Sequence, residues 1–196
     1  MSGTFIEKLG GILKDPGTDP DSPHPDLRVA SVLVPLVESR GTVSFVFSTR
    51  TDSVPHHKGQ ICFPGGSRES GDESLLYTAL REAEEEMGIR RDDVRILGRM
   101  EAVPTMTMFF ITPYVCSIPS HYRFTPDPFE VDEIFYAPLK EFLDFGRYRT
   151  TETVFKGRSY PVYFIDYGER TIWGATAKIV RKLAELVKES GLDSYL

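Results

Sequence analysis

Residues 65–89 read GGSRESGDESLLYTALREAEEEMGI and carry the clearest structural signal in the chain. Asp72 is a good helix N-cap, and Glu73 places negative charge in the first turn, where the helix dipole favours it. Gly88 suits the left-handed conformation that ends many helices. Nearly every residue between these two signals is a good helix former. The stretch therefore predicts one helix that begins after Asp72 and ends at Gly88.

The expected helix has an apolar face and an acidic face. At about 3.6 residues per turn, five side chains share the apolar face and can be buried against a sheet: Leu76, Ala79, Leu80, Ala83 and Met87. Glu82, Glu85 and Glu86 share the acidic face, at positions i, i+3 and i+4. Like charges at this spacing cost roughly 0.2–0.5 kcal/mol per pair, so the helix gains no stability from them. The acidic face is therefore a candidate functional site.

Two neighbouring features favour a metal site over a solvated run of charge at residues 84–86. Arg81 lies four residues before Glu85 and can hold that carboxylate in place. Gly65 and Gly66 lie just upstream and allow backbone to approach the helix closely. Hard divalent cations such as Mg²⁺ bind carboxylate and carbonyl oxygens. The acidic face is therefore interpreted as a metal cradle.

Residues 81–89, which read REAEEEMGI, resemble the core of the Nudix box at every fixed position. That box is the signature of hydrolases that act on nucleoside diphosphates linked to another moiety. The resemblance implies Mg²⁺ or Mn²⁺ as cofactor and an α/β/α sandwich with a central mixed β-sheet. It also implies a metal-binding and catalytic set, in which Arg81 orients a glutamate and the metal ligands are Glu82, Glu85, Glu86 and the carbonyl oxygen of Gly66.

Upstream of this core the sequence departs from the usual box. The box has five residues between its glycine and its first glutamate, whereas six residues separate Gly66 from Glu73. Either the loop is one residue longer, or Asp72 takes the acidic position.

The resemblance leaves two candidates for the catalytic base, because Nudix enzymes take this group either from the box or from a later loop. Glu82 is the candidate from the box. Glu133 is the other, because it lies on an expected late strand just before Pro138, where related enzymes place functional carboxylates. The alternative interpretation of Glu133 is an exposed charge on an edge strand.

A second motif narrows the substrate, because residues 48–66 resemble the motif that precedes the Nudix box in coenzyme A diphosphatases. Arg50, Gly59 and the run FPGG at residues 63–66 fall at the expected spacing, whereas Pro55 stands where that motif carries an arginine. The resemblance implies hydrolysis of the diphosphate bond of coenzyme A or a derivative, giving 3′,5′-ADP and 4′-phosphopantetheine. The loop offers four groups that could bind the 3′-phosphate of coenzyme A: Arg50, His56, His57 and Lys58.

Other functions stay open at this point. An ordinary polar loop is the alternative to a phosphate-binding loop, and the substrate is then ADP-ribose, a dinucleotide polyphosphate or another nucleoside diphosphate derivative. A Nudix module that only binds a nucleotide is less well supported, because such modules usually lose box glutamates that this chain retains.

The chain is expected to fold as an N-terminal arm with a Pro-rich linker (residues 1–27) and one Nudix hydrolase domain (residues 28–196). A short helix is expected at residues 5–13, a turn or two of helix at 138–143 and a long amphipathic helix at 175–190. Strands are expected at residues 28–37, 42–49, 60–63, 94–100, 109–118, 130–137, 149–155, 159–166 and 171–173. Strands on both sides of a central helix indicate a layered α/β domain.

Composition limits the partners. The net charge of −6 disfavours nucleic acid and anionic membranes as partners. The resemblance to Nudix hydrolases implies a small nucleoside diphosphate substrate as the partner. No run approaches the roughly 18 apolar residues of a membrane span. Cys62 and Cys116 lie in apolar runs and are expected to be reduced, as suits a cytoplasmic protein. A homodimer is possible.

Overall fold

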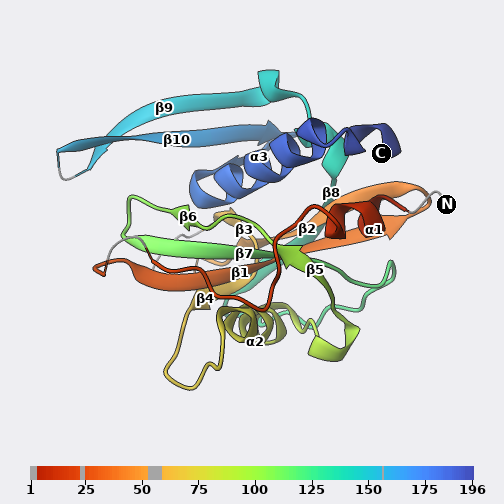
Figure 1. Cartoon of the computed structure of the whole chain (residues 1–196), viewed down its shortest axis with the longest axis horizontal. Helices are drawn as coiled ribbons and strands as arrows, with labels where there is room; N and C mark the ends of the chain where they lie inside the picture. Colours follow the sequence, from red (N-terminus) through yellow and green to blue (C-terminus); the bar gives the residue numbers. More distant parts are fainter. Residues whose placement is uncertain (1–3, 23–24, 53–58, 156) are drawn as a thin grey trace.

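The computed structural model describes residues 4–22, 25–52, 59–155 and 157–196, and a mixed β-sheet lies at its centre (Figure 1). The strand order is β3-β2-β1-β7-β5, with β4 on β1, β6 on β7 and β8 on β2. These strands are β1 (Arg28–Ser39), β2 (Thr42–Arg50), β3 (Ile61–Cys62), β4 (Gly65–Ser67), β5 (Arg95–Arg99), β6 (Val103–Pro104), β7 (Phe109–Ser117) and β8 (Val131–Pro138). The pair β1 and β7 is parallel and the other pairs are antiparallel, which confirms the predicted mixed sheet.

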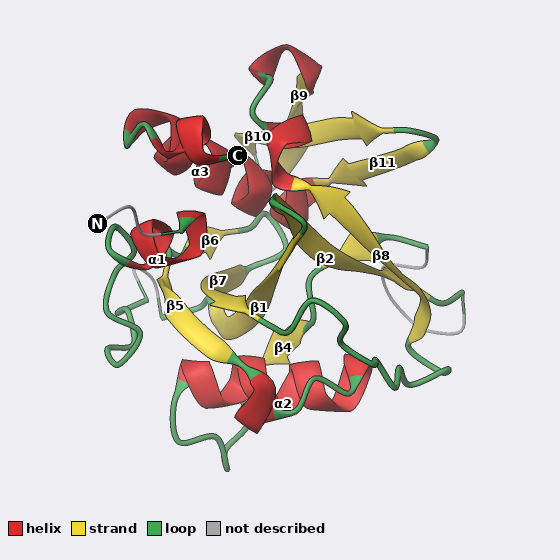
Figure 2. Cartoon of the chain, turned by 90° about the vertical axis from the view of Figure 1, so that its right-hand side faces the viewer, coloured by secondary structure: helices red, strands yellow, loops and turns green. Residues whose placement is uncertain are grey.

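Helices cover both faces of this sheet. Helix α2 (Leu75–Met87) lies on one face, and α3 (Gly174–Glu189) lies on the other, together with a three-stranded sheet (Figures 1 and 2). That second sheet consists of β9 (Tyr148–Phe155), β10 (Arg158–Tyr167) and β11 (Arg170–Trp173). Four short 3₁₀ helices complete the described structure: Arg91–Asp93, Leu139–Phe142, Phe145–Arg147 and Leu192–Tyr195. The predicted α/β/α layers are confirmed.

Strand alternation explains why the sheet has two cores. Successive side chains of a strand point to opposite faces. On β1, Leu33 and Val37 join the core under α2, whereas Val34 and Leu36 join the larger core on the α3 side. Because both faces are buried, β1 is a nearly continuous apolar run rather than an alternating one.

Helix α2 begins two residues later than the sequence predicts. Its N-cap is Ser74, whose hydroxyl accepts a hydrogen bond from the Tyr77 N–H at 3.1 Å. The prediction of Asp72 as N-cap is therefore wrong, because its carboxylate is engaged by side chains elsewhere. The predicted end is confirmed, since Gly88 adopts the left-handed conformation with a φ of 68°.

The N-terminal segment contributes to the domain at two places. In α1 (Phe5–Gly10), Phe5, Ile6 and Leu9 are buried in the core on the α3 side. Farther along, the carboxylate of Asp19 accepts a hydrogen bond from the Leu75 N–H at 3.1 Å, at the first turn of α2. The described parts of the predicted arm thus pack against the domain, while the boundary at residue 27 stays a prediction.

The two glycines before α2 lie in a short strand that the sequence did not predict. Gly65 and Gly66 lie in β4, which pairs antiparallel with Ala30 to Val32 of β1. A Cβ atom at Gly65 would lie 2.3 Å from the carbonyl oxygen of Ser31, so only glycine permits this approach. Glycine spacing alone did not distinguish a turn from a closely packed edge strand.

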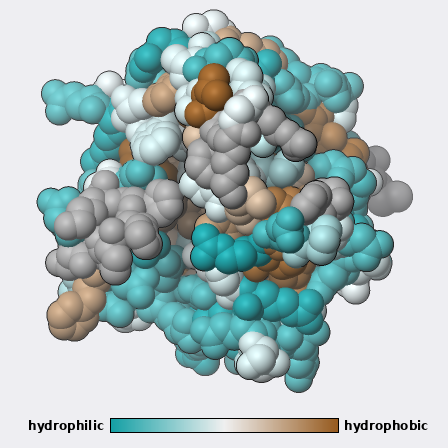
Figure 3. Space-filling model, turned by 90° about the vertical axis from the view of Figure 1, so that its left-hand side faces the viewer, coloured by the Kyte–Doolittle hydropathy of each residue, from teal (hydrophilic) through white to brown (hydrophobic). Residues whose placement is uncertain are grey.

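Large exposed hydrophobic side chains are scattered over several elements, namely Ile12, Phe129, Tyr136, Phe145, Val154, Trp173 and Tyr195. One side of the molecule shows a mainly hydrophilic surface with smaller hydrophobic areas (Figure 3). The possible homodimer stays a prediction.

Among the described residues, no helix is long and apolar enough to cross a membrane.

Candidate active site

Arg81 joins three carboxylates at the middle of α2. Its guanidinium donates to Glu82 and to Glu85, each at 2.9 Å, and forms two hydrogen bonds to Asp72 at 3.0 and 3.2 Å. The pair with Glu85 has the i, i+4 spacing expected from the sequence. The bonds to Glu82 and Asp72 were not expected. Arg81 therefore fixes the orientation of two of the predicted metal ligands at once.

Asp72 is the acidic residue that bonds to the Nudix-like segment at residues 81–89, through Arg81. It is buried, and besides Arg81 its carboxylate accepts hydrogen bonds from the Thr78 hydroxyl at 2.8 Å and the Glu69 N–H at 2.9 Å. Glu73 is exposed, and its carbonyl oxygen accepts a bond from Arg68. Of the two alternatives left by the sequence, the contacts favour Asp72 in the acidic position.

These contacts predict a specific acid dependence of stability. Hydrogen bonds from Arg81 lower the pKa of Asp72 to about 2, although burial opposes the shift. A depressed pKa in the folded state stabilises the fold fully above the unfolded value of about 3.9, and this contribution is lost as pH falls toward 2. Asp72→Asn is therefore expected to lower the free energy of unfolding at pH 7 and to flatten its decline between pH 4 and 2, as measured by urea titration.

Asp166→Asn provides the matched control for this prediction. Asp166 also pairs with an arginine, Arg149 at 2.9 Å, but both side chains are more than half exposed. Exposed pairs contribute little to stability, so this variant should follow the wild-type pH curve. If the free energy of unfolding of Asp72→Asn declined between pH 4 and 2 as steeply as that of the wild type, the lowered pKa of Asp72 would be contradicted.

Glu86 is the most enclosed of the three glutamates. Its side chain is 4% exposed, compared with 18% for Glu82 and 59% for Glu85. One carboxylate oxygen accepts from Arg50 at 3.0 Å and the other from the Gly65 N–H at 3.1 Å. Burial raises the pKa of Glu86 to about 7 despite these donors, and burial also raises the pKa of Glu82. Nearby positive charge would therefore favour the ionised form of both groups.

The donor chemistry of this cluster fits a hard divalent cation. Gly66 lies against Glu82, because a Cβ at Gly66 would come within 2.3 Å of a Glu82 carboxylate oxygen. The Glu82 carboxylate thus lies against the backbone of Gly66, and oxygen donors of this kind are the ones that Mg²⁺ and Mn²⁺ prefer. As the side chains stand, no group of three or more His, Cys, Asp or Glu in the described part of the chain is arranged to hold a metal. Arg81 bonds to one oxygen each of Glu82 and Glu85, and Arg50 bonds to one oxygen of Glu86, so each carboxylate is held by an arginine and keeps lone pairs that a metal could use.

Comparison with known proteins agrees with this geometry. The NUDIX domain family model matches residues 27–161. The uncharacterized Nudix hydrolase NudL of Yersinia pestis is 37% identical over 160 residues, which cover 82% of this chain and 80% of that protein. The chain belongs to the Nudix hydrolase family. It is thus an enzyme of a diphosphatase family, and its substrate contains a diphosphate.

Solved structures agree with the Nudix fold. The MutT protein of Methanosarcina mazei has a TM-score of 0.54 at 18% identity, with 87% of this chain and 99% of that chain covered. A MutT/nudix family protein of Enterococcus faecalis has a TM-score of 0.56 at 14% identity, with 87% and 66% covered. At these identities the likeness concerns the fold alone.

Glu133 does not join the glutamates of this Nudix hydrolase. It lies on the same face of β8 as Phe135, which belongs to the core on the α3 side, away from α2. Its carboxylate is held by Arg170 of β11 at 2.8 Å. Glu130, which the sequence reasoning did not select, is instead the carboxylate from this region that reaches the site, through Arg50 at 3.3 Å. Alternation along β8 could have placed Glu133 with Phe135, whereas Glu130 lies in the turn just before β8, where no strand pattern indicates its direction.

The remaining predicted residues are three groups of the proposed phosphate-binding loop and the two cysteines. His56, His57 and Lys58 lie outside the described residues. Cys62 and Cys116 are free thiols, as expected, and burial raises the pKa of Cys62 to about 11.

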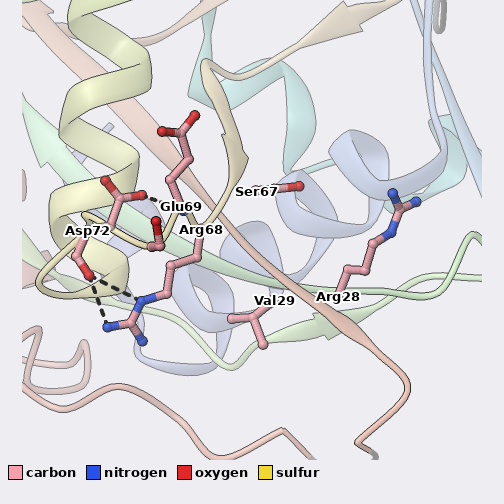
Figure 4. A pocket seen from close by; sticks show the side chains of 7 residues that line it. Arg28, Val29, Ser67, Arg68, Glu69 and Asp72 are labelled. Atoms are coloured by element: carbon pink, nitrogen blue, oxygen red, sulfur yellow. Dashed lines mark hydrogen bonds between the residues drawn. The ribbon is translucent and has the colours of Figure 1, made fainter.

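A hollow of about 510 Å³ lies beside the site and shares only Asp72 with it. It is lined by Arg28, Val29, Asp72 and residues 67–70, but by none of the three box glutamates. Arg28 and Arg68 extend in different directions from its wall, and Arg68 donates a hydrogen bond to the carbonyl oxygen of Asp72 (Figure 4). These guanidinium groups do not converge on one point, so the hollow is not assigned a ligand.

Proposed function

We propose that this Nudix hydrolase cleaves the diphosphate bond of coenzyme A or a derivative in a reaction that needs Mg²⁺ or Mn²⁺. The products are 3′,5′-ADP and 4′-phosphopantetheine. The observation that carries the proposal is the resemblance of residues 48–66 to the motif of coenzyme A diphosphatases. Arg50 and Gly65, near the two ends of this segment, both donate hydrogen bonds to Glu86, which supports a joint role of the segment and the box.

Glu82, Glu85 and Glu86, with the Gly66 carbonyl oxygen, are the proposed metal ligands. When bound, the ion supplies charge neutralisation at the diphosphate and a more acidic water. Arg81 orients Glu82 and Glu85 from the protein side. Of the two proposed bases, Glu82 is favoured, because the carboxylate of Glu133 is held by Arg170 on the other side of the sheet.

The 3′-phosphate distinguishes coenzyme A from most other Nudix substrates and provides the test. His56, His57 and Lys58 are its proposed donors. Charge-assisted contacts contribute about 1.5–3 kcal/mol each, so coenzyme A should be preferred over 3′-dephospho-coenzyme A and ADP-ribose by roughly 10- to 100-fold. Because histidine gains charge near its ordinary pKa of about 6.5, the preference should increase from pH 8 to pH 6 if either histidine takes part.

The assay measures kcat/KM for these three substrates with Mg²⁺ and with Mn²⁺, and identifies the products by chromatography. Lys58→Ala should reduce the preference for coenzyme A, whereas Lys140→Ala, in the 3₁₀ helix Leu139–Phe142, should leave it unchanged. Equal rates on coenzyme A and its dephospho form at every pH would leave only the broader Nudix activity standing.

A further inference from the structure

Arg50, the last residue of β2, bridges two carboxylates from distant parts of the chain. One guanidinium nitrogen is 3.0 Å from a Glu86 oxygen on α2, and another is 3.3 Å from a Glu130 oxygen just before β8. Its side chain is only 23% exposed. These contacts join β2, α2 and the segment before β8 at one point. Two of its N–H donors are thus engaged by protein carboxylates rather than directed at open solvent.

Arg50 is also the charged partner of a glutamate that is almost completely buried. The second oxygen of Glu86 bonds to the Gly65 N–H, so the carboxylate is gripped from β2 on one side and from β4 on the other. A buried carboxylate that loses its cation loses its favourable environment and tends to change position or protonation. The orientation of Glu86 therefore depends on Arg50.

The backbone of Arg50 closes the loop that carries the proposed substrate groups. Its N–H donates to the Gln60 carbonyl oxygen at 3.0 Å, and its carbonyl oxygen accepts from the Gly59 N–H at 3.0 Å. The next residue, Thr51, donates its N–H to the Glu130 carbonyl oxygen, also at 3.0 Å. One residue thus fixes the base of the 51–59 loop through its backbone and a predicted metal ligand through its side chain.

We propose that Arg50 is a positioning residue, which holds Glu86 and Glu130 in place for catalysis, and not a ligand of the substrate 3′-phosphate. A guanidinium group suits this role because it is planar and carries several N–H donors, so it can bind two carboxylates at once. Lysine, a compact ammonium on a flexible stem, keeps the charge but does not reproduce that geometry. This role rests on the proposed metal function of Glu86 and is independent of coenzyme A as the substrate.

The kinetic test uses Arg50→Lys with coenzyme A, or with ADP-ribose if coenzyme A is not cleaved. A positioning role predicts that kcat falls about 10- to 100-fold at saturating Mg²⁺. KM should stay within about twofold, since a residue that does not touch substrate leaves ground-state binding intact. The ratio of rates on coenzyme A and its dephospho form should also stay unchanged. A raised KM with full kcat, or a reduced ratio, would assign Arg50 to substrate binding and overturn the proposal.

A second measurement needs neither metal nor substrate. In urea unfolding of the metal-free protein, Arg50→Lys should lower the midpoint, and it should do so by less in a Glu86→Gln or Glu130→Gln background, because the partner is already altered. Arg147→Lys is the matched control. Arg147 forms an ion pair with Glu141 at 2.8 Å, and this exposed pair does not involve Glu86 or Glu130. It should give the same small shift in every background. Additive effects of Arg50→Lys with both glutamate variants would show that the bridge does not form and would refute the proposal.

Discussion

Glu85→Gln is expected to lower kcat by about 100-fold or more while leaving the stability of the metal-free protein unchanged. Glutamine keeps the length, shape and helix propensity of glutamate but removes the charge that a hard cation requires. The side chain is 59% exposed and its bond to Arg81 is an i, i+4 pair, so its loss costs the fold little. The measurements are kcat with Mg²⁺ and with Mn²⁺, and the urea midpoint without metal.

Glu84→Gln provides the control for this variant. Glu84 is the neighbouring glutamate on the same helix, is about half exposed and lies 3.7 Å from Arg91 rather than from Arg81. It should retain wild-type kcat. Chelation of divalent ions should stop the wild-type reaction, and Mg²⁺ or Mn²⁺ should restore it. Near-normal turnover in both Glu85→Gln and Glu86→Gln would refute the assignment of the metal site.

Local sequence signals predicted the layers of the fold well, because each of them reports on a single element. The apolar face of α2 and its end at Gly88 depend on helix geometry alone, and both are confirmed. The strands were found within a few residues of their observed bounds, because their apolar and β-branched runs are bounded by turn residues. The two-residue strand β6 and the glycine strand β4 were missed, because neither carries such a run.

The start of α2 could not be decided locally, since Asp72 and Ser74 both satisfy the N-cap preference. The choice is made by tertiary contacts. Asp72 is drawn to Arg81, nine residues away, and the Leu75 N–H is bonded by Asp19, 56 residues away. A spacing rule along one helix contains neither contact.

The candidate site was predicted where its residues share a helix and missed where they come from different strands. Helical spacing brought Arg81 and Glu85 together correctly. The bridge from Arg50 to Glu86 and Glu130 spans separations of 36 and 80 residues. The contact with Glu130 depends on the pairing of β2 with β8, and the contact with Glu86 depends on the packing of α2 against the sheet. Neither the packing nor the pairing can be read from the spacing of residues along one element.

Arg81→Ala should have the largest combined effect on stability and activity, because it removes the shared partner of three carboxylates. Asp72 would be left as a buried charge without its cation, which costs about 3–5 kcal/mol. That is a large part of the roughly 5–15 kcal/mol that stabilises a typical domain. Activity should fall as well, since Glu82 and Glu85 lose the donor that orients them. The measurements are the urea midpoint and kcat at saturating Mg²⁺.

The double variant Arg81→Ala with Asp72→Asn separates these two effects. Replacing Asp72 removes the unpaired buried charge, so the double variant should recover much of the stability that Arg81→Ala loses. It should not recover kcat, because nothing restores the contacts to Glu82 and Glu85, and misplaced ligands lower the rate steeply. If the double variant recovered both stability and kcat, the role of Arg81 would be only to pair with Asp72 in the fold. A single variant that raised only KM, with kcat unchanged, would instead assign Arg81 to substrate binding.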